Sequence, residues 1–204
     1  MEVMQQNREQ LILKALPKAI SYQDYRILTE EHALSDTNSG PEITEGLANY
    51  TKLNHRRMKR LDKTLKISEE LKDKIAKYSK NVTWLVLTET WCGDAAQTMP
   101  MIQKFADHNP GIKFKVLLRD EHLELMDQFL YNGGRSIPKL IAFDTDTNEV
   151  IGDWGPRPSE ATKMVNDYKA AHGKLTSEFK EDLQVWYNKD KGANTAEDLS
   201  KLLK

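Results

Sequence analysis

The stretch with the clearest chemical potential is Thr88–Pro100, TETWCGDAAQTMP, which contains Cys92, the only cysteine of the 204-residue chain. A cysteine thiolate attacks disulfides and forms mixed disulfides with them. Because one cysteine cannot close an internal disulfide, a redox cycle at Cys92 needs a second thiol from outside the chain. The first question is therefore whether this thiol does chemistry or only occupies the place of a reactive one.

The composition describes a polar chain of balanced charge. Hydrophobic residues make up 39% of it, enough for one core, and the formal net charge is -1. This balance gives no overall attraction to nucleic acid or to an anionic membrane, and no run reaches the roughly 20 apolar residues of a membrane span, so we expect neither as a partner. The first residues lack the basic-then-apolar order of a secretory signal. We therefore expect a cytoplasmic protein, in a compartment where a free thiol persists.

The five histidines are scattered, without the spacing of metal ligands, so no metal site is expected. The segment 144–148, DTDTN, resembles the start of a calcium loop but lacks the glycine and the bidentate glutamate that such a loop requires. We interpret it as a hairpin turn.

The elements that would position Cys92 lie between residues 68 and 172. Short β-favouring runs predict four strands, at 82–88, 112–118, 139–144 and 149–154. Periodic patterns predict four helices, at 68–79, 96–108, 121–132 and 158–173. Helical crossovers imply parallel pairing, and the short turn at 145–148 implies a final antiparallel hairpin. The expected fold class is therefore α/β, a mixed β-sheet flanked by helices.

The two ends of the chain are predicted to be helical additions. Residues 5–33 indicate short helices broken at Pro17, residues 47–65 a long helix, and residues 174–204 two more helical pieces. We divide the chain into an N-terminal helical extension, a central domain and a C-terminal helical extension, with bounds 1–67, 68–172 and 173–204. The extensions suit partner docking or a homodimer.

The element order and three motifs resemble the thioredoxin superfamily. Residues 91–93, WCG, follow a buried strand and open a helix, as in a thioredoxin WCGPC site. Pro100 lies where a thioredoxin has its helix-kinking proline, and residues 135–138, RSIP, match the segment that ends in a cis-proline. The resemblance implies a thioredoxin-like fold for residues 68–172, with helical extensions on both sides.

The same resemblance implies a site. In this family the cis-proline exposes the backbone of the preceding residue, which pairs with an extended substrate segment. Cys92 would be the catalytic residue, and the substrate-binding residues would be Trp91, Gly93, Asp94, Ile137, Pro138, Gly155 and Arg157. For Arg157 two interpretations are open, a positive charge at the groove or an exposed arginine without a partner.

This chain departs from the thioredoxin pattern at three positions. Ala95 replaces the second cysteine, so a dithiol cycle cannot close within the motif. Asp94 stands in place of the proline between the cysteines, and Val86 in place of the buried aspartate that assists proton transfer. The resemblance therefore supports the architecture, and it argues against efficient dithiol-disulfide reduction.

The start of a helix is expected to lower the pKa of Cys92, because unpaired amides and the helix dipole favour the thiolate. Asp94 would oppose this effect if its carboxylate faces the sulfur, and would have no such effect if it points into solvent. On balance the sequence predicts a moderately reactive thiol.

Two functions fit these observations, and the sequence leaves open whether the protein is an enzyme. The first is thiol-disulfide exchange through Cys92, with glutathione or another low-molecular-weight thiol as co-substrate and no resident cofactor. Its partners would be protein or small-molecule thiols and disulfides, as in cell redox homeostasis. The alternative is a non-catalytic module that binds peptides or proteins, in which Cys92 is a buried passenger.

Overall fold

The computed structural model describes residues 2–204, with side chains from residue 8 onward. Its α-helices are α1 (Glu2–Ala15), α2 (Tyr22–Leu34), α3 (Glu45–Thr64), α4 (Glu69–Ala76), α5 (Gly93–His108), α6 (Leu123–Met126), α7 (Ser159–His172), α8 (Ser177–Asp190) and α9 (Ala193–Ser200). Two short 3₁₀ helices are η1 (Leu16–Lys18) and η2 (Arg119–Glu121). The strands are β1 (Ile20–Ser21), β2 (Val82–Thr88), β3 (Ile112–Leu118), β4 (Lys139–Asp144) and β5 (Glu149–Trp154).

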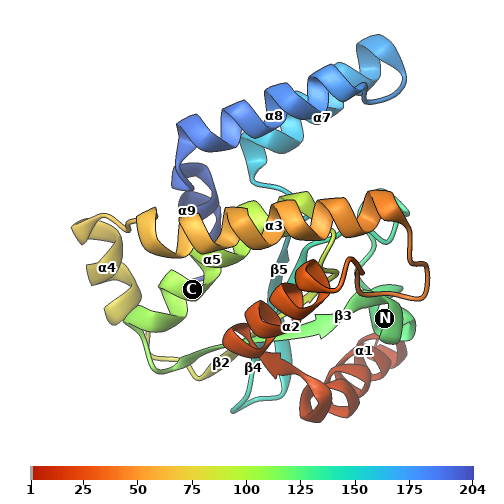
Figure 1. The fold of residues 1–204 in the computed structure, drawn as a ribbon. Coiled ribbons are helices and arrows are strands. Elements are labelled where there is room, and N and C mark those ends of the chain that lie inside the picture. Colours follow the sequence, from red (N-terminus) through yellow and green to blue (C-terminus); the bar gives the residue numbers. More distant parts are fainter. Residues whose placement is uncertain (1) are drawn as a thin grey trace.

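The strands form one mixed sheet in the order β1-β3-β2-β4-β5, flanked by helices (Figure 1). Strand β2 pairs parallel with β3 and antiparallel with β4, and β4 continues into β5 as an antiparallel hairpin. Every residue of β2 is buried, which explains why this strand is a continuous apolar run in the sequence. The predicted α/β class with a mixed sheet is confirmed.

The expectation that each crossover pairs its strands in parallel is correct for β2 and β3 but wrong for β4. The only α-helix between β3 and β4 is α6, which has four residues and rises about 6 Å. A strand of seven residues is about 23 Å long. The chain therefore does not return along the sheet to the end at which β3 begins. Strand β4 begins at the end of the sheet where β2 and β3 finish, and it runs antiparallel to β2.

The helix predicted at 121–132 is also wrong for most of its length. The structure has η2 and α6, followed by turns and an isolated bridge between Tyr131 and Gly134. The apolar spacing that indicated a helix comes from Leu125, Met126 and Phe129. These side chains are buried in the core, although they belong to α6 and to the turn that follows it.

The N-terminal residues contain an edge strand that the sequence did not indicate. Strand β1 has two residues and pairs antiparallel with β3 between α1 and α2. Two residues are too few to show an alternating pattern, so only the pairing itself defines this strand. Pro17 lies in η1, between the two predicted helices.

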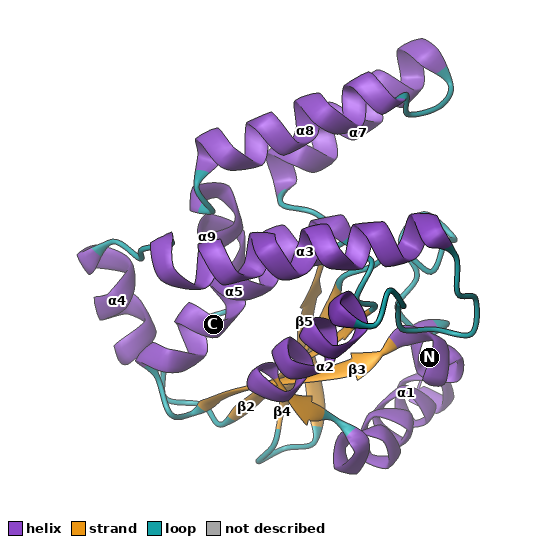
Figure 2. Ribbon diagram, viewed as in Figure 1, coloured by secondary structure: helices purple, strands orange, loops and turns teal. Residues whose placement is uncertain are grey.

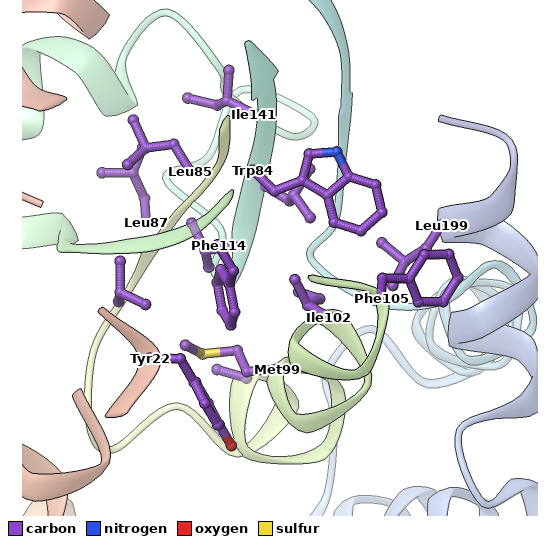
Figure 3. Close-up of a cluster of buried hydrophobic side chains, with 14 of the residues drawn as sticks. Tyr22, Trp84, Leu85, Leu87, Met99, Ile102, Phe105, Phe114, Ile141 and Leu199 are labelled. Atoms are coloured by element: carbon purple, nitrogen blue, oxygen red, sulfur yellow. The ribbon is translucent and has the colours of Figure 1, made fainter. Parts of the chain in front are cut away.

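The main core includes residues from both ends of the chain. Trp84 of β2 packs on Phe105 of α5, with ring centroids 5.4 Å apart, and Leu199 of α9 lies beside Phe105 (Figure 3). Tyr22 of α2 stacks on Phe114 of β3 at 5.4 Å. Helices at both termini therefore bury apolar side chains against the central sheet.

Helices α7 and α8 form a hairpin that extends away from the sheet (Figure 2). The hairpin has its own small cluster of buried side chains, separate from the main core: Ala161, Val165, Phe179, Leu183 and Tyr187. This arrangement places α8 across from α3 and above the start of α5 (Figure 1).

Candidate functional site

Cys92 lies between β2 and α5 and is the N-cap residue of α5. Its Sγ accepts a hydrogen bond from the Ala95 amide at 3.5 Å, and its S–H group donates to the Ile137 carbonyl at 3.3 Å. Only 6% of the residue is exposed. The thiol is therefore at the expected helix start, but it is enclosed and hydrogen-bonded.

Two further loops meet the loop of Cys92. The peptide bond between Ile137 and Pro138 is cis, and the Ile137 carbonyl is the group that accepts the thiol hydrogen. Gly155 has φ +116°, and a Cβ at this position would lie 2.2 Å from the Pro138 carbonyl oxygen. Glycine is therefore required where this third loop passes the second.

Asp94 points into the protein and is 12% exposed. Its Oδ2 pairs with the Arg157 guanidinium at 2.7 Å, and its Oδ1 accepts a hydrogen bond from the Tyr187 hydroxyl at 3.0 Å. The interpretation of Asp94 as a solvent-facing acid is wrong, and so is that of Arg157 as an arginine without a partner. Tyr187 lies 93 residues from Asp94 in the sequence, so no local pattern pointed to it.

Trp91 is half-buried beside the motif cysteine. The Arg119 guanidinium lies 5.2 Å from the centre of its ring, within the range of a cation–π contact. This contact holds the indole in place beside Cys92.

The residues before Cys92 are held by the N-terminal part of the chain. The Ser39 hydroxyl donates to the fully buried Glu89 carboxylate and accepts a hydrogen bond from the Thr90 amide at 2.8 Å. Asn54 of α3 donates to the Thr90 carbonyl at 2.9 Å, and burial raises the pKa of Glu89. No local pattern in the sequence pointed to this network, because its partners lie far apart along the chain.

A groove of about 1160 Å³ opens beside Cys92. One wall comes from α3, with Leu47, Tyr50 and Leu53, and the opposite wall comes from residues 174–184 at the start of α8. The floor contains residues 91–94, 135–137 and 156–157. Of the eight predicted site residues, Pro138 and Gly155 do not line the groove themselves and instead shape the loops beneath it.

The order of these elements and loops agrees with a comparison to known families. A thioredoxin family model matches residues 40–169, well over half of the chain. The chain belongs to the thioredoxin family. The match starts before α3, so it includes the helix that forms one wall of the groove.

Two solved structures share this thioredoxin fold. A protein of unknown function from Pseudomonas aeruginosa is 14% identical with a TM-score of 0.55, over 76% of this chain and 84% of that chain. An HIV epitope scaffold is 15% identical with a TM-score of 0.55, over 76% of this chain and 85% of that chain. At these identities the likeness shows the fold alone. No curated protein matches the chain.

In this thioredoxin-family chain, the surroundings of Cys92 favour the neutral thiol over the thiolate. Burial raises the pKa of Cys92 to about 12, and the neighbouring Asp94 carboxylate acts in the same direction. The Ala95 amide and the Arg157 charge lower this pKa but do not compensate for burial. The expected lowering of the Cys92 pKa by the helix start is therefore wrong, because desolvation outweighs the hydrogen bonds from the Ala95 and Asp94 amides.

The role of Asp94 is testable by substitution. Asp94→Asn removes the negative charge beside the sulfur and leaves the Arg157 charge in place, so both effects favour the thiolate. We expect the Cys92 pKa to fall by about one unit. The measurement is the rate of alkylation against pH, followed by intact mass. Glu181→Gln, which neutralises another acid that lines the groove, is the matched control. An unchanged midpoint in Asp94→Asn would show that burial alone sets the pKa.

Among the side chains of residues 8–204, no group of three or more His, Cys, Asp or Glu is arranged to hold a metal ion. In the same part of the chain, none of the helices combines the length and the apolar character needed to cross a membrane.

Proposed function

We propose that this protein is a thioredoxin-fold binding module, whose groove holds an extended polypeptide segment without a covalent step. In this proposal Cys92 is a protonated residue in the floor of the groove. A reduced compartment such as the cytoplasm, in which the thiol stays free, fits this role.

The observation that carries the proposal is the state of Cys92. The nucleophile in thiol chemistry is the thiolate. With a pKa of about 12, only about one Cys92 thiol in 100,000 is ionised at pH 7. The S–H group is also engaged with the Ile137 carbonyl. A neutral, enclosed thiol supports binding and argues against attack on a disulfide.

The size of the groove supports a polypeptide as the occupant. Pockets for small molecules typically have about 300–1,000 Å³, and this groove exceeds that range. Tyr50 and Leu53 line it and are 48% and 41% exposed, so apolar contact area is free for an occupant. A segment of several residues in extended form fits these dimensions and contacts.

The test selects peptides that bind the protein from a random library without cysteine. The affinities of the enriched sequences are then measured. We expect Cys92→Ala to bind them as the wild type does. Tyr50→Ser/Leu53→Ser should weaken binding about ten-fold, because it removes exposed apolar area in the groove. The matched control is Ile27→Ser/Leu34→Ser, at two exposed apolar residues outside the groove. Equal weakening by both double variants would contradict the proposed place of binding.

Monothiol exchange is the second candidate, because Cys92 does line the groove. In that reaction the Cys92 thiolate attacks one sulfur of a disulfide, and the other sulfur leaves as a thiolate. A low-molecular-weight thiol such as glutathione then attacks the mixed disulfide and releases Cys92. Incubation with oxidised glutathione distinguishes the candidates: a rapid stoichiometric adduct by intact mass supports exchange, and an unmodified protein supports binding.

Reduction of insulin disulfides gives an independent test of the chemistry. We expect the wild type and Cys92→Ser to reduce insulin at the same low rate in dithiothreitol. Ala95→Cys should stay within about two-fold of the wild type, because the Cys92 thiolate needed for the first attack is scarce. A large gain in Ala95→Cys would show a reactive Cys92 that lacks only a resolving partner, and would favour the second candidate.

A further inference from the structure

The side chains that line the groove are mostly basic. Seven basic residues line it, Arg57, Arg119, Arg135, Arg157, Lys169, Lys174 and Lys180. Three acidic residues line it, Asp94, Glu178 and Glu181. Since the whole chain has a net charge of -1, this excess of positive charge is local to the groove.

Part of this basic charge is already neutralised. Arg157 pairs with Asp94, Arg119 with Asp120, and Arg135 with Asp127. The other four, Arg57, Lys169, Lys174 and Lys180, form no ion pair with any carboxylate of the described side chains, and Arg57 donates a hydrogen bond to the neutral Asn54 Oδ1 at 3.2 Å. The unpaired positive charge is therefore available to an occupant of the groove.

The unpaired charges lie on opposite walls. Arg57 belongs to α3 and lies next to Gly93, with its Nη1 3.7 Å from the position of a Cβ on that glycine. Lys174 and Lys180 are exposed residues of the α7–α8 hairpin, on the other wall. Apolar side chains also line both walls, among them Tyr50 on α3 and Leu175 next to Lys174. The site thus offers apolar contacts together with positive charges.

We propose that the groove selects extended polypeptide segments rich in Asp and Glu, with apolar side chains between the carboxylates. This inference rests on the proposed binding function and specifies its ligand. Glu178 and Glu181 lie on the same wall as the lysines, and they disfavour a polyanion with a phosphate at every residue. Carboxylates spaced along a peptide can instead avoid them and reach Arg57, Lys174 and Lys180.

The test uses three cysteine-free peptides of about ten residues with the same apolar positions and Glu, Gln or Lys at the others. Fluorescence anisotropy with the full chain gives their affinities. We expect the Glu peptide to bind about ten-fold tighter than the Gln peptide, and the Lys peptide to bind weakest. The preference should shrink between about 0.05 M and about 0.5 M salt, where exposed charges are screened over shorter distances.

Lys174→Glu/Lys180→Glu should remove the preference for the Glu peptide over the Gln peptide. Lys163→Glu/Lys189→Glu is the control, with the same charge change at exposed residues of α7 and α8 outside the groove. It should keep the preference.

The outcomes separate this inference from the function on which it rests. Binding of all three peptides with equal affinity would overturn the acidic selectivity and leave the binding module intact. Binding of none of them would overturn the proposed function and the inference with it. Tighter binding of a single-stranded oligonucleotide of matched length than of the Glu peptide would overturn the choice of a polypeptide.

Discussion

Cys92 in the folded protein is expected to react with iodoacetamide about 100-fold more slowly, or slower still, than the same cysteine in the unfolded chain. An unperturbed cysteine has a pKa of about 8.5, whereas burial and Asp94 raise that of Cys92 to about 12. The thiolate fraction at neutral pH therefore falls by about three powers of ten. The greater nucleophilicity of a more basic thiolate recovers part of this loss, and the 6% exposure of the residue adds a barrier to access.

The measurement compares alkylation rates in buffer and in urea at the same pH by intact mass. In the folded protein the rate should still be rising above pH 9, toward the pKa of about 12. An alkylation rate in the folded protein close to that in the unfolded chain would show an accessible thiolate and would support thiol exchange instead of binding.

The same shift predicts how stability depends on pH. The folded-state pKa of Cys92 lies above its unfolded value, so the neutral buried thiol contributes stability that is complete below about pH 8.5. That contribution is lost as the pH rises toward 12. Relative to Cys92→Ala, the wild type should therefore lose stability over this range. The comparison with the variant removes the contribution of tyrosines and lysines that titrate in the same range.

Arg157→Met is expected to lower the free energy of unfolding by about 3 kcal/mol, because it leaves the buried Asp94 carboxylate without its charged partner. The loss should shrink as the pH falls toward 4. Burial already raises the pKa of Asp94 in the wild type, and loss of the Arg157 charge raises it further, so the variant is penalised most where Asp94 is ionised and least at low pH, where it is the neutral acid. Urea denaturation at several pH values measures both effects.

Arg135→Met is the matched control for this prediction. Arg135 and Asp127 pair at 2.6 Å, but both side chains are more than 40% exposed, so the loss should stay below about 1 kcal/mol. In addition, Asp94→Asn/Arg157→Met should cost less than the two single changes together, since the double variant leaves no unpaired charge. Equal losses in Arg157→Met and Arg135→Met would show that the Asp94 pair contributes no more than a surface pair.

The groove is built largely by segments outside the strands and loops that define the family's motifs. Helix α3 supplies one wall and α8 the other, while Tyr187 of α8 and Arg157 before α7 hold the motif residue Asp94. In the proposed function, these segments make the position of Cys92 part of the floor of a binding site.

The sequence by itself determined the strands and the loops that follow them. The runs at 82–88, 112–118, 139–144 and 149–154 are strands with the predicted bounds. The strands at 82–88 and 139–144 are buried throughout, which leaves a nearly continuous apolar run, whereas those at 112–118 and 149–154 are partly exposed and are marked by local β-favouring residues. The loops that carry Cys92, Ile137 and Gly155 follow from the order of these strands and from the family resemblance.

Only the tertiary structure decided the chemical state of Cys92. A helix start is visible in the local sequence, and it predicted a lowered pKa. Burial and the field of Asp94 depend on side chains that approach from elsewhere in the chain, and these effects are larger. Contacts between distant segments likewise decided the direction of β4, the two-residue strand β1 and the partners of Asp94. Each of these features depends on proximity in space, which a periodic pattern does not record.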